Sequence, residues 1–455
     1  MATVPPGFDV FGDLFSTPEM RATFSEEAWF ARMVDVEGAL ARAEGAVGVV
    51  PQEAAEAISN VCAAFTPDMA ALKTGTERVG YPVLPLVRQI AAASGPSGGY
   101  VHWGATTQDV MDTGLVLQVR AGLDLIETDL VRLIEALIDA ARKYRAAPMA
   151  GRTHLQHALP ITFGLKCAGW LAPLTRTLER LRQCRARVLH LQFVGAVGTL
   201  ASLGANGQAV REALGAELDL QVPAVGWHTA RDGLGEAACV LGILTGALGK
   251  IATDIVFLMQ SEVGEVFEPY APGRGGSSTM PQKRNPVASE YIIAAQRNVQ
   301  ALVPVMLGAG AADHERGTGP WHAEWTALPQ IFLLSAGAVA RTAEIVEGME
   351  VDTDRMAANL QISRGLIMAE PVMMALAGAL GRQEAHDVVE EHCRAAIEED
   401  KSLGEVLKAS GAITAHLDAG AIDALLDPQN YTGSAGAFTE KAIEDAEQLL
   451  GEKQT

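Results

Sequence analysis

The chain has 455 residues, of which 49% are apolar and 20% charged, so it is long enough for about three domains and for a large core. A bare peptide or a small disulfide-stapled scaffold is thereby excluded. Its 35 Lys and Arg residues against 55 Asp and Glu residues give a formal net charge of −20. That charge argues against nucleic acid or an anionic membrane surface as the main partner, because its field repels phosphates.

The five cysteines are scattered singly, which predicts neither a disulfide framework nor a structural zinc site. The N-terminus has no basic region followed by an apolar one, so we expect a cytoplasmic protein. The longest apolar stretch, residues 240–259, contains Lys250 and Asp254. A membrane span rarely carries both charges near its middle, so a buried bundle helix is the better interpretation.

Apolar residues at helical spacing dominate the chain. An N-terminal helix is predicted from the stripe Trp29, Met33, Val36, Leu40, Ala43 and Val47. A longer helix follows, in which apolar residues alternate at spacings of three and four from Val116 to Leu137. Further helices are predicted over residues 173–191, 236–265, 289–308, 328–347 and 370–380.

Strand signals are weak, since aromatic residues are few and Val and Ile follow the helical period. The predicted class is therefore all-α, with long helices in the middle of the chain. Breaks in the pattern predict an N-terminal helical domain over residues 1–110, a central long-helix bundle over 111–351 and a C-terminal helical domain over 352–455.

The first of three unusual polar segments, residues 102–109 (HWGATTQD), directly precedes the long helix. Thr106 or Thr107 could cap that helix, with Asp109 complementing its dipole. Capping accounts for Asp109, but it explains neither His102 nor two adjacent hydroxyls. Because free N–H groups and hydroxyls at a helix N-terminus bind carboxylates, we interpret this segment as a carboxylate site.

The second segment, residues 151–160 (GRTHLQHALP), follows the long helix as a turn that ends in proline. A single histidine is most often structural, but here His154 and His157 stand beside Thr153 and Gln156. Histidine carries protons near neutral pH, which indicates acid–base chemistry. Zinc binding is the competing interpretation, although the two histidines lack a third ligand at the usual spacing.

The third segment, residues 273–286 (GRGGSSTMPQKRNP), is too rich in glycine for a helix. A flexible linker is the simple explanation, yet linkers seldom end in Met-Pro-x-Lys-x-Asn-Pro. We interpret the segment as a mobile loop that brings a hydroxyl to a substrate and encloses it, since closure expels water. Lys283 and Asn285 could then hold carboxylate oxygens. No Gly-x-Ser-x-Gly motif is present, and a serine-hydrolase triad is not otherwise suggested.

Residues 276–286 (GSSTMPQKRNP) closely resemble the signature sequence of the fumarase/aspartase superfamily, and the two upstream segments resemble its other two active-site regions. The resemblance extends over nearly the whole chain, from Met20 to Tyr431. It implies a mostly helical three-domain subunit, a homotetramer built on a twenty-helix bundle, and active sites each shared by three subunits.

The resemblance also implies residue roles. Ser277 matches the loop serine, thought to be the base in elimination and hence the proton donor in the addition direction. His154 matches the second histidine, which handles the leaving or entering group. The other candidates would bind a small polycarboxylate substrate: His102, Thr106, Thr107, Thr153, Gln156, Arg274, Ser278, Lys283, Asn285 and Arg316. Neither a metal nor an organic cofactor is implied.

The chemistry implied by the resemblance passes through an aci-carboxylate that carries two negative charges on one carboxyl group. Lys283, Asn285, Thr107 and helix-terminal N–H groups would stabilise it, and this should be the largest contribution to catalysis. An unaided serine hydroxyl is a poor acid or base, so the loop must tune Ser277 through N–H donors and Lys283.

Two branches of the superfamily compete. Residues 227–232 (WHTARD), 314–325 (HERGTGPWHAEW) and 427–431 (DPQNY) resemble the 3-carboxy-cis,cis-muconate cycloisomerases of the bacterial protocatechuate (β-ketoadipate) pathway. Adenylosuccinate lyase, a C–N lyase that releases fumarate, is the alternative. It usually carries Thr-x-His-Asp where this chain has residues 77–82 (ERVGYP). Gln282 stands where cycloisomerases often have His, so a C–N lyase could share the same frame.

A third hypothesis is a structural protein that kept this fold without activity. The chain retains Ser277, Lys283, Asn285 and His154 together. A purely structural descendant has no physical reason to keep that set, so we expect an enzyme.

Overall fold

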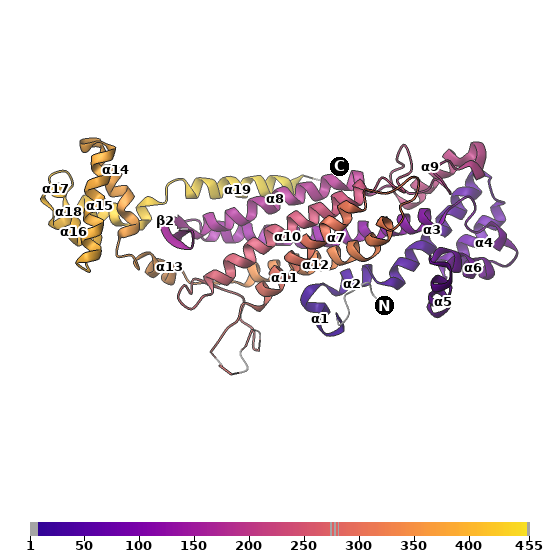
Figure 1. Ribbon diagram of the computed structural model, residues 1–455, viewed down its shortest axis with the longest axis horizontal. Coiled ribbons are helices and arrows are strands. Elements are labelled where there is room, and N and C mark those ends of the chain that lie inside the picture. Colours follow the sequence, from indigo (N-terminus) through magenta and orange to yellow (C-terminus); the bar gives the residue numbers. More distant parts are fainter. Residues whose placement is uncertain (1–7, 274, 277–278, 281, 453–455) are drawn as a thin grey trace. The chain divides into compact units, whose positions relative to one another are not determined.

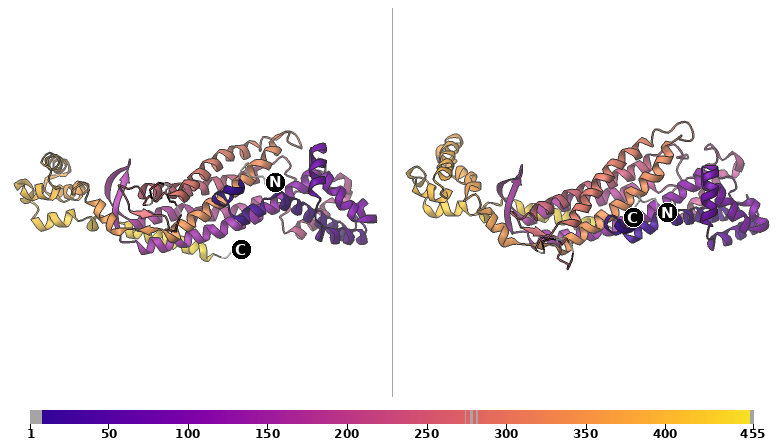
Figure 2. Two further views of the ribbon diagram at one scale, coloured as in Figure 1. Left: turned by 90° about the horizontal axis from the view of Figure 1, so that it is seen from below. Right: turned by 60° about the horizontal axis from the view of Figure 1, so that its bottom comes forward.

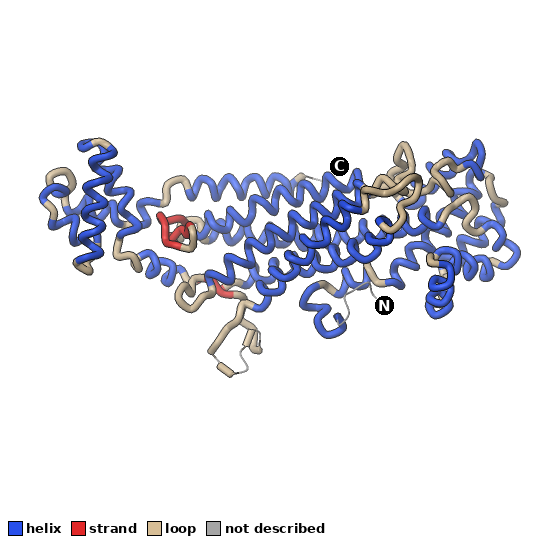
Figure 3. The backbone as a smooth tube through the Cα atoms, in the orientation of Figure 1, coloured by secondary structure: helices blue, strands red, loops and turns tan. Residues whose placement is uncertain are grey.

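The computed structural model describes residues 8–273, 275–276, 279–280 and 282–452. Helices account for most of this part of the chain, and strands form two small antiparallel pairs (Figure 1, Figure 3). The predicted all-α class is therefore confirmed. The strands are β1 (Pro148–Thr153), β2 (Gln156–Thr162), β3 (Val266–Phe267) and β4 (Glu350–Val351).

The helices fall into three successive groups along the chain. The first group is α1 (Phe8–Phe15), α2 (Pro18–Thr23), α3 (Glu26–Val47), α4 (Gln52–Ala63), α5 (Met69–Val79), α6 (Val83–Ala93) and the 3-10 helix η1 (Gly95–Tyr100). The second is α7 (Thr107–Lys143), α8 (Phe163–Val188), η2 (Ala201–Asn206), α9 (Gly207–Leu218), α10 (Asp232–Leu258), α11 (Val287–Gly308) and α12 (Pro320–Gly348). The third is α13 (Thr353–Leu360), η3 (Leu366–Met368), α14 (Ala369–Leu380), α15 (Arg382–Glu398), α16 (Leu403–Ala409), α17 (Gly411–Thr414), α18 (Ala419–Leu426), η4 (Pro428–Tyr431) and α19 (Ala435–Gly451).

The chain divides into two compact units. Unit 1 contains the described residues of Met1–Leu130, Thr177–Gly249 and Tyr291–Arg341, and unit 2 contains those of Val131–Arg176, Lys250–Glu290 and Thr342–Thr455. Five helices, α7, α8, α10, α11 and α12, contribute residues to both. Within each unit their segments lie side by side (Figure 1, Figure 2). The three-domain division of the sequence stays a prediction.

Helix α7 contains the predicted heptad stripe. The seven residues of the stripe are fully buried: Val116, Val119, Leu123, Ile126, Leu130, Leu133 and Leu137. Asp109 in the first turn and Lys143 in the last turn complement the helix dipole. The periodicity of the sequence thus located the element that presents the first polar segment at its N-terminus.

Helix α8 begins at Phe163, earlier than the predicted start at Pro173. A proline is common in the first turn of a helix, where its missing N–H is not needed, so Pro173 suggested a start. In the structure Pro173 lies inside the helix instead. The other predicted helices are found as α3, α10, α11, α12 and α14, with ends that differ by up to eight residues.

The segment predicted as a proline-terminated turn is a β-hairpin in unit 2, so that prediction was wrong. Strands β1 and β2 pair antiparallel, with Thr153 opposite Gln156. The two residues between them, His154 and Leu155, have φ angles of 51° and 62°. Both central residues of a two-residue type I′ hairpin turn have positive φ, a conformation that usually selects Asn or Gly. Neither residue gives that signal, and this is why the hairpin was missed.

Helix α10 is, in the described part of the chain, the one helix long and apolar enough to cross a membrane by length and composition. Half of its most apolar window is buried inside the chain. In unit 2 its Asp254 accepts a hydrogen bond of 2.8 Å from Trp170 Nε1 on α8. The charged side chain of Asp254 therefore contacts a neighbouring helix, as expected for a helix bundle.

The last group of helices has its own core in unit 2. Helices α14 to α18 pack around Val372, Leu376, Leu403, Leu407 and Ile413, all fully buried. These helices stay clustered in both views of Figure 2. In the same unit, Arg142 and Arg145 at the end of α7 form ion pairs with Glu447 and Glu440 of α19.

Candidate active site

Asp109 organises the N-terminus of α7 in unit 1. Its carboxylate, 1% exposed, accepts hydrogen bonds from the backbone N–H groups of Thr106 (3.1 Å), Val194 (3.1 Å) and Gly195 (2.9 Å). Nε2 of His228 lies 2.9 Å from Oδ1. The bond to Thr106 is half of a capping box, in which the third helical residue reaches back to the capping residue. Asp109 therefore does more than complement the dipole, since it also fastens residues 194–195 and His228 to the helix.

One turn further along α7, a buried guanidinium lies between two carboxylates. Arg231 donates to Asp112 at 2.7 and 3.0 Å and to Glu324 at 2.9 and 2.5 Å, and each of the three is at most 2% exposed. Burial alone would lower the pKa of Arg231, but the two carboxylates more than offset it and raise that pKa. Burial raises the pKa of Glu324, and Arg231 opposes the shift. The network binds α7, the segment before α10 and α12 together at the first polar segment.

Two predicted substrate-binding residues of unit 1, Arg316 and Thr106, contact each other. Nη1 of Arg316 lies 3.4 Å from the hydroxyl of Thr106, and its Nη2 donates to the carbonyl of Ala196 at 3.0 Å. Thr107 is the first residue of α7 and is half-buried. A cation and two hydroxyls are thus gathered at the start of a helix in unit 1, an arrangement that suits a carboxylate.

His102, in the same segment, has a φ of 62°. Its Nδ1 lies 2.6 Å from Oε1 of Glu37 on α3. Burial lowers the pKa of His102, but the charge of Glu37 and its hydrogen bond outweigh burial and raise that pKa, with a smaller contribution from Asp109. His102 is therefore a candidate cation for an anionic substrate.

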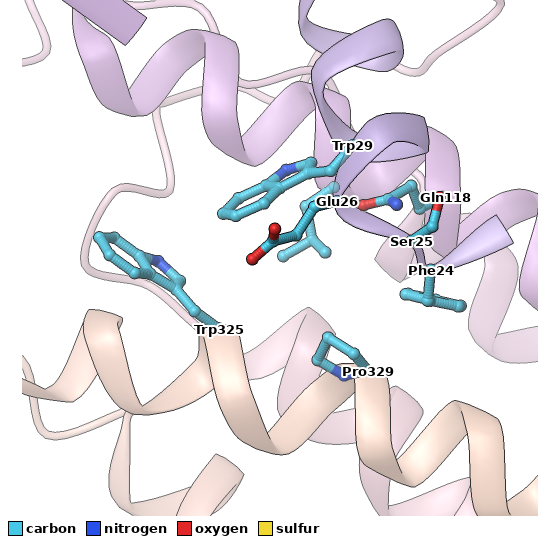
Figure 4. A pocket seen from close by; sticks show the side chains of 8 residues that line it. Phe24, Ser25, Glu26, Trp29, Gln118, Trp325 and Pro329 are labelled. Carbon is cyan, nitrogen blue, oxygen red and sulfur yellow. The ribbon is translucent and has the colours of Figure 1, made fainter. Parts of the chain in front are cut away.

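Aromatic side chains gather beside this network in unit 1. Trp321 stacks on Tyr81 with ring centroids 5.8 Å apart, and its Nε1 donates to Asp112 at 3.1 Å. The centroids of His322 and Trp325 lie 4.5 Å apart. Trp325 and Trp29 line a small pocket with Pro329 and Phe24 (Figure 4). The polar side chains of Ser25, Glu26 and Gln118 line the same pocket.

The hairpin β1–β2 carries Thr153, His154 and Gln156 in unit 2, and all three side chains are exposed. Next to its turn the hairpin is held by a bidentate pair, in which Arg152 donates to Glu265 at 2.6 and 3.0 Å. Asn359 of α13 donates to the same carboxylate at 2.7 Å. Burial, followed by the charge of Arg152, lowers the pKa of His157. The hairpin is therefore anchored directly beside its turn, where the side chains of the predicted residues are exposed.

The glycine-rich loop, also in unit 2, is anchored next to Lys283 and Asn285, which were predicted to bind the substrate. Arg284 donates to both oxygens of Glu350 at 3.0 Å and to the carbonyl of Glu268 at 2.7 Å. The backbone N–H of Asn285 donates to the carbonyl of Gly275 at 2.9 Å. Lys283 is exposed and Asn285 half-buried. Ser277, Ser278 and Arg274 lie outside the described residues.

The loop continues directly into α11, whose start is capped by a buried acid. Glu268 accepts from the backbone N–H of Ala288 and Ser289 and from the Ser289 hydroxyl, at 3.3, 2.8 and 2.7 Å. Together with Arg284 this fixes the C-terminal end of the loop. Lys283 and Asn285 therefore lie close to a rigid attachment point.

One group of metal-ligating side chains lies in the described part of the chain, outside the two sets of predicted residues. His386, Asp387 and Glu390 on α15 have ligand atoms within 4.8 Å of one another, and all three are exposed. Exposed acidic groups at helical spacing are common without any ion. None of the three belongs to the predicted site.

The structure thus groups the predicted residues into two sets. His102, Thr106, Thr107 and Arg316 lie in unit 1, and Thr153, His154, Gln156, Lys283 and Asn285 lie in unit 2. Four residues that organise the first set were not predicted from the sequence: Asp112, His228, Arg231 and Glu324. Segments 227–232 and 314–325, which contain His228, Arg231 and Glu324, were noted only as part of the resemblance. The hydrogen bonds that these residues form join positions about 90–120 residues apart in the chain.

The chain is similar to known families and solved structures over most of its length. Residues 15–301 match the family model described as "Lyase", and residues 365–442 match "Adenylosuccinate lyase C-terminus". The 3-carboxy-cis,cis-muconate cycloisomerase of Pseudomonas aeruginosa is 48% identical over 442 residues, covering 96% of each chain. The crystal structure of the 3-carboxy-cis,cis-muconate lactonizing enzyme from Pseudomonas putida matches with a TM-score of 0.93 and 45% identity, over 97% of this chain and 100% of that one.

A crystal structure of fumarate lyase from Mesorhizobium sp. BNC1 matches with a TM-score of 0.90 and 46% identity, over 94% of this chain and 98% of that one. Both the family model and these relatives cover well over half of the chain. The resemblance seen in the three polar segments is thereby confirmed at the level of the family. The chain belongs to the lyase family and is an enzyme of the fumarase/aspartase superfamily.

Proposed function

We propose that this enzyme is a 3-carboxy-cis,cis-muconate cycloisomerase. The observation that carries the proposal is the 48% identity over 96% of the chain to an enzyme of that name. The first polar segment supports it, because the start of α7 with Thr106 and Arg316 suits a substrate with several carboxylates. The net charge of −20 makes such a local cationic site necessary for an anionic substrate.

In the proposed reaction one substrate carboxylate oxygen adds to a carbon of the conjugated diene. A C–O bond forms, the π bond breaks, and the electron pair moves onto the neighbouring carboxyl group as an aci-carboxylate. Lys283, Asn285 and Thr107 would stabilise that charge. Ser277 then donates its proton to the adjacent carbon and recovers one from solvent. His154 would orient the attacking carboxylate, which needs no deprotonation.

The proposal includes the assembly. The predicted residues fall into two sets, and the side chains of Thr153, His154 and Gln156 are exposed in the single chain. Exposed polar side chains of this kind suit a site completed by other copies of the chain. We therefore propose a homotetramer in the cytoplasm with active sites shared by three subunits.

A C–N lyase acting on adenylosuccinate or another substituted aspartate is the second candidate. Two observations favour it: the match of residues 365–442 to the adenylosuccinate lyase C-terminus, and Gln282 at the position before Lys283. The elimination would use the same aci-carboxylate, so the site cannot distinguish the two by its charges alone.

Purified protein incubated with 3-carboxy-cis,cis-muconate tests the proposal. Lactonisation removes the diene, so we expect its ultraviolet absorbance to decay at a rate proportional to enzyme concentration. S277A is the matched control and should leave the absorbance nearly unchanged. A stable diene together with fumarate release from adenylosuccinate would instead establish the C–N lyase.

A further inference from the structure

We infer that Glu37 is a positioning residue for the reaction: it holds the His102 ring by Nδ1 so that Nε2–H is presented to a carboxylate of the substrate. The inference rests on the proposed function for the identity of that substrate. The pairing itself lies wholly within unit 1, between α3 and the segment that leads into α7.

The geometry of the pair is that of a carboxylate that orients an imidazole. Oε1 of Glu37 is 2.6 Å from Nδ1, and the side chains are 0% and 20% exposed. The other ring nitrogen, Nε2, has no hydrogen-bond partner among the described residues. His102 also holds a left-handed backbone conformation, with φ 62°, that a non-glycine residue adopts at a cost. The fold thus fixes this ring on one side and leaves the other nitrogen for a ligand.

The protonation state decides what Nε2 can do. In a neutral ring whose Nδ1–H donates to Glu37, Nε2 carries a lone pair and repels a carboxylate. In the imidazolium both nitrogens donate, so Nε2–H forms a charge-assisted hydrogen bond with a carboxylate. A buried negative charge at Glu37 favours the imidazolium, in agreement with the raised pKa of His102.

The other ionisable groups around the pair do not supply this charge. Asp109 on α7 contributes less than Glu37, and its oxygens are occupied by three backbone N–H groups and His228. Arg211 on α9 interacts with Asp109. On the far side of Glu37, burial raises the pKa of Glu44 to about 9 and that of Cys62 to about 12, so both are neutral near pH 7.

Glu37→Gln is the decisive variant, because Gln can still accept the Nδ1–H bond while its charge is gone. Glu44→Gln is the matched control, since it lies two turns away on the same buried face of α3 and is already neutral. The first measurement is an NMR titration of histidine side chains, with the His102 signal assigned by its loss in H102Q. We expect the pKa of His102 to fall in E37Q and to stay unchanged in E44Q.

The second measurement is the pH dependence of KM for 3-carboxy-cis,cis-muconate. In the wild type KM should stay low until the pH rises through the pKa of His102. In E37Q this increase should begin at lower pH, so that KM at pH 8 is about tenfold higher while kcat changes less than about twofold. A structural role for Glu37 would lower the amount of folded enzyme and leave the pH profile of KM in place.

Each outcome decides the inference. An identical His102 titration in the wild type and E37Q, or a shifted titration with an unchanged KM profile, overturns it. If E37Q does not fold, H102Q tests the same step and should raise KM at pH 6.5 and remove its pH dependence; an unchanged KM overturns the inference. If the wild type does not convert carboxymuconate, the proposed function fails, while the titration still decides whether Glu37 holds His102 protonated.

Discussion

Nε2 of His228 lies 2.9 Å from Oδ1 of Asp109, and the two side chains are only 5% and 1% exposed. This contact joins the segment before α10 to the first turn of α7, where the first candidate substrate-binding residues lie. Asp109 and the nearby Arg231 are both buried charges with several partners. The stability of variants of these two residues therefore tests whether their buried contacts hold the start of α7 in place.

Asp109→Asn keeps the shape of the side chain but turns one acceptor into a donor that faces backbone N–H groups. We expect the free energy of unfolding to fall by about 2–3 kcal/mol, because buried donors lose their acceptor. Urea unfolding followed by circular dichroism measures this. Asp139→Asn on the same helix is the control, since the Asp139 side chain is 86% exposed, and should change little. Equal effects of the two variants would contradict the role given to Asp109.

Arg231→Met leaves Asp112 and Glu324 as buried carboxylates without their cation. The expected loss is about 3–5 kcal/mol of unfolding free energy. Arg187→Met is the matched control, because the Arg187 side chain is 56% exposed and its pair with Glu236 should contribute about 1 kcal/mol or less. If both variants unfold at the same urea concentration, the buried network does not stabilise the site.

Glu44 gives the protein a specific pH dependence of stability. Its two oxygens are buried without a hydrogen-bond partner among the described residues, and burial, with the charge of Glu37, raises its pKa from 4.5 to about 9. Between these values the unfolded chain releases the proton and the folded chain keeps it. The Glu44 contribution to the free energy of unfolding therefore falls as the pH rises through this window.

Glu44→Gln resembles the neutral form at every pH, so this fall should disappear. We expect the stability of E44Q relative to the wild type to increase steadily from pH 5 to pH 8. Thermal unfolding of the two proteins at several pH values measures the difference. A difference that is constant with pH would mean that Glu44 is ionised in the folded protein.

Ser277→Ala tests the proposed proton donor. Turnover of carboxymuconate should fall by at least about a hundredfold, the lower limit for loss of general acid–base catalysis, with little change in stability. Steady-state kinetics and thermal unfolding on the same samples separate the two effects. Unaltered turnover would remove Ser277 from the mechanism.

The sequence predicted the elements whose signal is local. The buried stripe from Val116 to Leu137 and the helix that carries it follow directly from the spacing of apolar residues. The hairpin β1–β2 could not be predicted in the same way, because its turn is formed by His154 and Leu155 in a conformation that neither residue favours. Periodicity identifies elements with regular burial, and a tertiary environment can override the preference of a short turn.

The same distinction between local and tertiary signals applies to the residues of the site. Thr106 and His102 stood out because polar residues crowd at a predicted helix end, whereas Arg316 was a candidate only through the resemblance to the superfamily. Arg231 and Glu324 lie outside the predicted helices 236–265 and 328–347, in segments noted only for the resemblance, and no local pattern marks them as partners. Their importance arises only when residues 93 and 119 positions apart in the chain meet in a buried network. Such pairings depend on the topology of the bundle, which a single sequence does not specify.

We propose that different copies of the chain complete one active site. Mixing S277A and H154N subunits, by co-expression or by refolding together, tests it most directly. If Ser277 and His154 come from different copies, about a quarter of the sites in mixed tetramers carry both native residues, and carboxymuconate turnover should recover far above either parent. If the mixture is no more active than the average of the two parents, each copy holds its own complete site, and the proposal of an active site shared between copies is wrong.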